Sequence, residues 1–224
     1  MSIPQTALDR MELLVFDLDG TLVDSELDLA NSVNATLVKL GREPLSVELI
    51  ASYIGQGVVV LISRSLGSDA PQELVEQATE IFLNHYREHM LDNTATYPGV
   101  REALSELDGR KMAVLTNKPV RFSRDMLKGL GLADRFLQIY GGNSFETKKP
   151  DPFGLNLLME EAGVTASTTL MIGDSVSDVL AGRNAGAWTC GVNYGFGAPT
   201  LDEAQPDIRI DNMRELPKLL NGKS

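Results

Sequence analysis

The chain has 224 residues, of which 43% are hydrophobic and 23% are charged, and its formal net charge at pH 7 is −11. This length and composition favour a folded protein with one large core, or a core and a small second domain, over a disordered chain. The negative charge argues against non-specific binding to nucleic acid or to an anionic membrane, and without a membrane-spanning apolar stretch or a signal-peptide pattern we expect a cytoplasmic protein.

The first predicted strand, residues 13–16, is apolar and runs directly into Asp17-Leu18-Asp19-Gly20-Thr21. Side chains alternate along a strand, so Asp17 and Asp19 are expected on the same side at its carboxyl end, and Gly20 permits a sharp turn. Two neighbouring carboxylates favour a cation, and ligands bind at the carboxyl ends of parallel strands. The pattern predicts a metal-dependent site for an anion. A hairpin turn, the alternative, would need a second strand, but the following residues read mostly as helix up to Leu40.

Residues 22–94 carry helical periods of apolar residues but no convincing strand. Loop signals interrupt these periods at residues 41–46, 55–57 and 67–71. The chain returns to an alternating pattern near Tyr97-Pro98-Gly99-Val100, where proline and glycine mark the return. We therefore expect an α-helical cap domain, residues 22–94, inserted into a core made of residues 1–21 and 95–224.

The remainder of the chain alternates short apolar runs with helical patterns. Further strands are predicted at residues 112–116, 136–140, 169–173, 188–193 and 207–211. The helices between them are predicted at residues 99–108, 121–131, 152–163 and 176–185. This alternation is typical of an α/β fold with a doubly wound, Rossmann-like parallel sheet that has helices on both faces.

Polar side chains follow the second strand of this core. Thr116, Asn117 and Lys118 supply a hydroxyl, an amide and an ammonium group at the sheet edge where Asp17 and Asp19 emerge. These groups suit a phosphate. Taken alone, they also fit the ordinary polar start of a loop.

Two more segments bring candidate groups to the same edge. Asp174 ends the strand at residues 169–173, and Asp178 lies one turn into the next helix; taken alone, Asp174 also fits a helix N-cap. Lys149 precedes Pro150, whose restricted backbone would hold the lysine toward the site, although an exposed basic turn is the alternative. The joint occurrence of these groups at one sheet edge makes a chance arrangement improbable.

A family resemblance rests on these same segments. In order and position, they resemble the motifs of the haloacid dehalogenase superfamily of phosphatases: Asp17-Leu18-Asp19-Gly20-Thr21, Thr116-Asn117, Lys149-Pro150, and Gly173-Asp174-Ser175 with Asp178. The stretch from Asp17 to Ser25, the helical insertion, Tyr97-Pro98-Gly99-Val100, and Gly141-Gly142 ahead of Lys149 resemble its phosphoglycolate phosphatase branch. Asn143 and Asp151 stand where that branch often has an acid and a histidine.

The resemblance implies a phosphatase that uses Mg²⁺ and an aspartyl-phosphate intermediate. Asp17 would be the nucleophile, and Asp19 the acid and base that protonates the departing alkoxide and then activates water. Mg²⁺ would be held by Asp17, the backbone carbonyl of Asp19 and Asp174, with Asp178 orienting metal-bound water. Lys149 would neutralise the nucleophile and the transferring group.

Substrate contacts follow from the same resemblance. Thr116 and Asn117 would hold phosphoryl oxygens, and the cap would close over the site and select the leaving group. Gly57 and Arg64 are the candidate contacts in the cap, where Arg64 would clamp a carboxylate. A solvated helix arginine is the alternative for Arg64, and Lys148 is expected in solvent.

The expected substrate is a small phosphorylated metabolite, with 2-phosphoglycolate, hydrolysed to glycolate and phosphate, as the first candidate. The alternative substrates are a sugar phosphate, a nucleotide or pyrophosphate. The alternative reaction is that of a phosphosugar mutase. A dehalogenase would not need Asp19 or the metal, and a phosphorylatable signalling module would not carry the helical insertion. A monomer or a homodimer is expected, without a nucleic-acid or membrane partner.

Overall fold

A six-stranded parallel sheet forms the centre of the protein in a computed structural model that describes residues 3–67 and 69–222. The strand order is β5-β4-β1-β6-β7-β8, which confirms the predicted doubly wound α/β fold. The strands are β1 (Leu13–Phe16), β4 (Lys111–Leu115), β5 (Gln138–Tyr140), β6 (Thr169–Gly173), β7 (Trp188–Val192) and β8 (Ile208–Ile210). The chain moves from β1 to β4 and β5 on one side and then to β6 on the other side of β1. Ligands bind at such a reversal of strand order.

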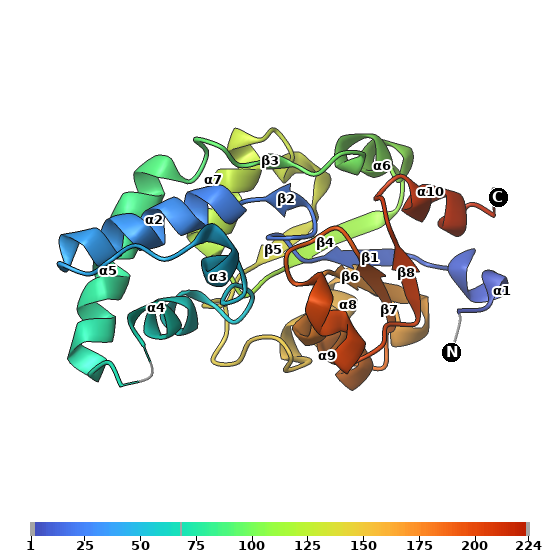
Figure 1. Cartoon of the computed structure of the whole chain (residues 1–224). Helices are drawn as coiled ribbons and strands as arrows, with labels where there is room; N and C mark the ends of the chain where they lie inside the picture. The colour runs from blue at the N-terminus through green and yellow to red at the C-terminus, as the bar shows by residue number, and fades with distance from the viewer. Residues whose placement is uncertain (1–2, 68, 223–224) are drawn as a thin grey trace.

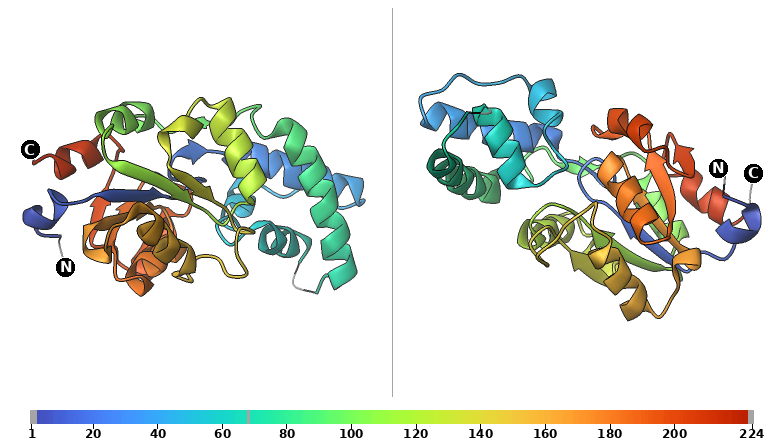
Figure 2. Two further views of the ribbon diagram at one scale, coloured as in Figure 1. Left: turned by 180° about the vertical axis from the view of Figure 1, so that it is seen from behind. Right: turned by 90° about the horizontal axis from the view of Figure 1, so that it is seen from below.

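Both faces of the sheet are buried under helices (Figure 1, Figure 2). Leu14 and Phe16 of β1 belong to the larger hydrophobic cluster, which includes side chains of α6, α7 and α10. Leu13 and Val15 point to the other face, into a cluster with α8. This arrangement explains why the core strands read as continuous apolar runs rather than as alternating patterns.

The core helices are α1 (Gln5–Leu8), α6 (Val100–Glu106), α7 (Val120–Gly129), α8 (Phe153–Ala162), α9 (Val176–Asn184) and α10 (Glu215–Leu220), with 3₁₀ turns η1 (Ala133–Arg135), η2 (Ala166–Thr168) and η3 (Ala198–Glu203). Helices α6 to α9 match the predicted positions within one or two residues at each end, the range over which assigned helix ends vary. The short helices α1 and α10 were not predicted. Within residues 3–67 and 69–222, the helices fall short of the length and apolarity needed to cross a membrane.

Four helices form a separate group beyond the carboxyl ends of β1 and β4 (Figure 1). They are α2 (Glu26–Lys39), α3 (Val47–Ala51), α4 (Val58–Leu66) and α5 (Gln72–His89). We call residues 26–89 the helical cap. The buried residues of α5 are Val75, Ala78, Phe82 and Tyr86, and this spacing of three or four residues places them on one face of the helix.

Two short strands join the cap to the core. Strands β2 (Val23–Asp24) and β3 (Ala95–Thr96) pair in an antiparallel ribbon, so the prediction that residues 22–94 contain no strand was wrong, and α2 begins only at Glu26. A two-residue strand is too short to produce an alternating pattern. The cap boundaries at residues 22 and 94, and movement of the cap as a separate domain, stay predictions.

Candidate active site

The turn after β1 is shaped by close packing between Gly20 and Asp174. Gly20 has a φ of +86°, and a Cβ atom at this position would lie 2.0 Å from Oδ2 of Asp174. Asp174 comes from the end of β6, which pairs directly with β1. Oδ2 of Asp174 also accepts a hydrogen bond from the backbone N–H of Gly197, at 2.8 Å. Glycine is therefore required at position 20 both for the backbone conformation and for the space that the carboxylate occupies.

Three buried carboxylates gather at this edge of the sheet. Asp17, Asp174 and Asp178 each offer an oxygen within 4.8 Å of the others. Lys149 Nζ lies 2.7 Å from Asp17 Oδ1 and 2.5 Å from Asp178 Oδ1. One ammonium cannot balance three carboxylates, and an all-oxygen donor set is what a hard divalent cation such as Mg²⁺ prefers. The cluster therefore fits a metal ion.

The electrostatics of the cluster also favour a cation. Burial raises the pKa of Asp17 to about 6, with a further increase from the charge of Asp178 and an opposing effect of Lys149. Burial, Asp178 and Asp17 raise the pKa of Asp174 well above its ordinary value. Both shifts show that ionised carboxylates are unfavourable here without additional positive charge. A divalent cation supplies that charge.

Asp178 is held by the start of its own helix. Its Oδ2 accepts hydrogen bonds from the backbone N–H of Ser175, at 3.0 Å, and from the Ser175 hydroxyl, at 2.6 Å. Its Oδ1 accepts the hydrogen bond from Lys149. These contacts place Asp178 as the residue that fixes Lys149 beside Asp17.

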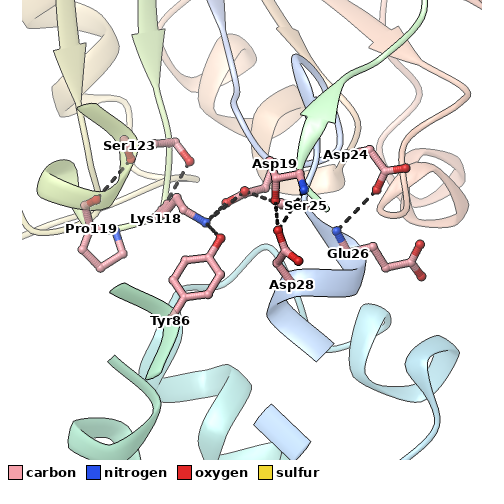
Figure 3. Close-up of polar contacts among 11 residues, drawn as sticks. Asp19, Asp24, Ser25, Glu26, Asp28, Tyr86, Lys118, Pro119 and Ser123 are labelled. Carbon is pink, nitrogen blue, oxygen red and sulfur yellow. Dashed lines mark hydrogen bonds and ion pairs between the residues drawn. The ribbon is translucent and has the colours of Figure 1, made fainter. Parts of the chain in front are cut away.

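The side chain of Asp19 has hydrogen-bond partners outside the carboxylate cluster. Its Oδ1 accepts a hydrogen bond from the Ser25 hydroxyl at 2.6 Å. Lys118 Nζ lies 3.0 Å from Oδ1 and 3.2 Å from Oδ2 (Figure 3). The two acidic residues of the first motif thus have different partners, Lys149 for Asp17 and Lys118 for Asp19. The environment separates two carboxylates that the sequence placed side by side.

Tyr86 is a site residue that the sequence analysis missed, and Lys118 was expected at this sheet edge but was assigned no role of its own. Both are buried, and Lys118 Nζ donates a hydrogen bond to the Tyr86 hydroxyl at 2.7 Å. Figure 3 shows Tyr86 reaching from the cap toward Lys118 of the core. Burial and the charge of Asp19 raise the pKa of Tyr86 well above its ordinary value, so the hydroxyl keeps its proton. The position of Lys118 directly after Thr116-Asn117 was the available signal, whereas Tyr86 resembles any other apolar-face residue of α5.

Asn117 links the core to the cap. Its Nδ2 donates hydrogen bonds to the backbone carbonyls of Gly55, at 2.8 Å, and Lys149, at 3.1 Å, while its buried Oδ1 has no protein partner. The Thr116 hydroxyl accepts a hydrogen bond from the backbone N–H of Lys118 at 3.2 Å. The predicted contacts of Thr116 and Asn117 with phosphoryl oxygens stay predictions.

A cavity of about 50 Å³ lies between the cap and the core. Its polar lining includes Asp17, Asp19, Thr116, Asn117 and Lys118, and Lys118 is the one basic residue among the described lining residues. Most of the remaining wall is apolar and comes from Leu29, Ile54, Val58, Leu61, Phe82, Leu83, Tyr86, Pro119 and Phe122. The cavity therefore combines the candidate catalytic groups with a small apolar chamber.

The two cap residues predicted to contact the substrate differ in position. Gly57 lines the cavity. Arg64 is exposed and its Nη2 donates to Oε1 of Gln56 at 3.1 Å, so the structure does not bring Arg64 together with the other candidates. Lys148 is exposed as expected, and its Nζ donates to the Gln56 backbone carbonyl at 2.6 Å.

Comparisons with known proteins show which family the chain belongs to. The family model described as haloacid dehalogenase-like hydrolase matches residues 14–192. The chain is 42% identical to a phosphoglycolate phosphatase of Pseudomonas putida, over 91% of this chain and 78% of that protein. It is 40% identical to a phosphoglycolate phosphatase of Vibrio parahaemolyticus, over 92% of this chain and 94% of that protein.

A solved structure shows the same fold. A crystal structure from Haemophilus somnus, described as a predicted phosphoglycolate phosphatase, superposes with a TM-score of 0.89 at 30% identity and covers 94% of this chain and 98% of that one. The predicted family is confirmed: the chain belongs to the haloacid dehalogenase-like hydrolases.

Proposed function

We propose that this protein is a Mg²⁺-dependent phosphomonoester hydrolase that acts through an aspartyl-phosphate on Asp17. The observation that carries the proposal is the separation of two carboxylates, one beside Lys149 and the metal-binding cluster, the other beside Lys118 and Ser25. Phosphoryl transfer through a carboxylate needs a nucleophile near positive charge and a second group that handles protons. Asp17 and Asp19 meet these two needs.

Asp17 and Asp174, with the backbone carbonyl of Asp19, would hold the Mg²⁺. When bound, the ion supplies positive charge that stabilises the phosphoryl group and keeps the nucleophile ionised. Lys149 adds a second positive charge beside Asp17 and is fixed there by Asp178. Charge stabilisation of this kind is the main contribution a protein makes to phosphoryl transfer.

Asp17 attacks the phosphorus of the substrate, the bond from phosphorus to the ester oxygen breaks, and Asp19 gives a proton to the departing alkoxide. Asp19 then takes a proton from water, which attacks the phosphorus and releases inorganic phosphate and Asp17. Ser25 and Lys118 orient the Asp19 carboxylate for both steps. A halide leaving group needs no proton, so this arrangement favours phosphate esters over haloacids.

We propose 2-phosphoglycolate as the substrate, with glycolate and phosphate as products. The names of the relatives from P. putida and V. parahaemolyticus support this choice. A cytoplasmic location, the absence of nucleic-acid and membrane partners, and a monomeric or homodimeric state stay predictions.

The test is phosphate release from 2-phosphoglycolate, sugar phosphates, nucleotides and pyrophosphate, with Mg²⁺ and with a chelator. We expect the highest kcat/KM for 2-phosphoglycolate, no turnover in the chelator, and no turnover by Asp17→Asn, because an amide is neither a nucleophile nor an anionic metal ligand. Turnover in the chelator or by the variant would overturn the mechanism. Preference for another ester would overturn only the substrate.

A further inference from the structure

The cavity offers few positive groups to a second anion on the substrate. Lys149 is engaged by Asp17 and Asp178. Lys148 and Arg64 bond to Gln56 at the protein surface. Lys118 is the basic residue of the described cavity wall. Lys118 is paired with one carboxylate, that of Asp19, whereas Lys149 is paired with two, so a carboxylate on the leaving group has Lys118 as its candidate ammonium.

Tyr86 provides a hydrogen-bond donor next to this ammonium. The Tyr86 hydroxyl accepts a hydrogen bond from Lys118 and retains its own proton for donation. Among the hydrogen bonds described for residues 3–67 and 69–222, none uses this proton. The Tyr86 side chain lines the cavity and is itself only 2% exposed. A buried hydroxyl that has a free proton, on a side chain that lines a cavity, is suited to donate a hydrogen bond to an anionic acceptor.

The position of Lys118 relative to Asp19 fits the geometry of a 2-phosphoglycolate molecule. Asp19 must contact the ester oxygen in order to protonate it. The carboxylate carbon of the substrate lies two bonds from that oxygen, and Lys118 Nζ lies 3.0 Å from Asp19 Oδ1. A substrate whose ester oxygen touches Asp19 thus has its carboxylate within reach of Lys118 and of the Tyr86 hydroxyl beside it.

We propose that the Tyr86 hydroxyl and the Lys118 ammonium form the receptor for the substrate carboxylate and so determine specificity. The inference rests on the proposed function and names the residues that recognise its substrate. Tyr86 comes from the cap and Lys118 from the core, so the receptor is complete only when the cap lies against the core. The Tyr86 ring is held by Phe82 at 5.4 Å and Phe122 at 5.6 Å between ring centroids.

The test compares Tyr86→Phe with the wild type on 2-phosphoglycolate and on ethyl phosphate, which has the same phosphoester and no carboxylate. The substitution keeps the packed ring and removes only the hydroxyl. We expect kcat/KM for 2-phosphoglycolate to fall roughly 10- to 100-fold, the range for one hydrogen bond to a charged group, mainly through a higher KM. Turnover of ethyl phosphate should fall by a clearly smaller factor, because this ester feels only the effect of Tyr86 on Lys118 and Asp19, so the ratio of the two kcat/KM values should shift toward ethyl phosphate.

Tyr53→Phe is the matched control, because Tyr53 is a half-buried cap tyrosine outside the described cavity lining. It should leave both substrates unchanged. Equal losses on both substrates in Tyr86→Phe would overturn the inference, since Tyr86 would then serve folding or catalysis. The inference would also be overturned if Arg64→Ala lowered kcat/KM for 2-phosphoglycolate while Tyr86→Phe left it unchanged. A wild type without preference for 2-phosphoglycolate would instead refute the proposed substrate.

Discussion

The ammonium of Lys149 lies 2.7 Å from Oδ1 of Asp17, and both groups are buried at the carboxyl ends of the central strands. The charge of Asp17 raises the pKa of Lys149 against the opposing effect of burial, so the ammonium remains charged. This ion pair sits beside two further carboxylates. The candidate site therefore contains more negative charge than the protein itself neutralises, and its stability should respond to any change in that balance.

Lys149→Met should destabilise the metal-free protein by about 3–5 kcal/mol, the range for leaving a buried charge without its partner. Mg²⁺ should recover part of this loss because it replaces the missing positive charge. Urea unfolding in a chelator and in Mg²⁺ measures both effects. Lys148→Met is the matched control, since Lys148 is exposed, and it should change stability by less than about 0.5 kcal/mol. Equal effects of the two substitutions would contradict the prediction.

Gly20→Ala should abolish Mg²⁺ binding and activity, because the added Cβ atom would occupy the space of the Asp174 carboxylate. Gly41→Ala is the control: Gly41 also has a positive φ, +71°, but a Cβ atom there would meet no heavy atom of the described chain within 4 Å. Both substitutions should lose about 1–2 kcal/mol of stability through backbone strain. Calorimetric titration with Mg²⁺ separates the effects, and normal Mg²⁺ affinity in Gly20→Ala would refute the packing argument.

The candidate core residues were predictable because they follow strands with strong patterns. Asp17 and Asp174 directly follow apolar runs, and the parallel order of β1 and β6 brings them together. The contact between Tyr86 and Lys118 was not predictable, because it depends on how the cap packs against the core across 32 residues of sequence. In sequence, Tyr86 only continues the apolar face of α5.

The contacts of Asn117 and Arg64 were also not predictable from the sequence, because they too depend on packing between elements. The polar character of Asn117 and its place after a strand were evident, but its hydrogen bond to the Gly55 carbonyl joins segments 62 residues apart. Arg64 was selected for its charge, and its exposure depends on which side of α4 faces the cavity. Sequence patterns indicate which element carries a group, whereas packing between elements decides what the group contacts.

Mg²⁺ should stabilise the protein more strongly at neutral than at acidic pH. Burial raises the pKa of Asp17 from 3.8 to about 6, so the folded metal-free protein binds this proton more tightly than the unfolded chain. The resulting stabilisation is full below about pH 4 and is lost as the pH rises through about 6. Mg²⁺ competes with the proton, so its effect on Tm should be larger at about pH 7.5 than at about pH 5.

Thermal unfolding with Mg²⁺ and with a chelator at both pH values measures this difference. Asp17→Asn removes the titrating group and should reduce the pH dependence of the Mg²⁺ effect. An equal increase in Tm at both pH values in the wild-type protein would contradict the assignment of Asp17 to the metal site.

Asp19→Asn should slow hydrolysis of alkyl phosphates roughly 10²- to 10⁴-fold, the usual contribution of general acid–base catalysis. It should still bind Mg²⁺, because the proposed ligand atom is the backbone carbonyl. The defect in forming the phosphoenzyme should shrink with p-nitrophenyl phosphate, whose leaving group hardly needs a proton. Rapid-quench measurement of phosphoenzyme formation with ethyl and p-nitrophenyl phosphate tests this. Asp24→Asn, which changes an exposed carboxylate of β2, is the control. If Asp19→Asn slowed phosphoenzyme formation equally with both esters, Asp19 would not be the group that protonates the leaving group.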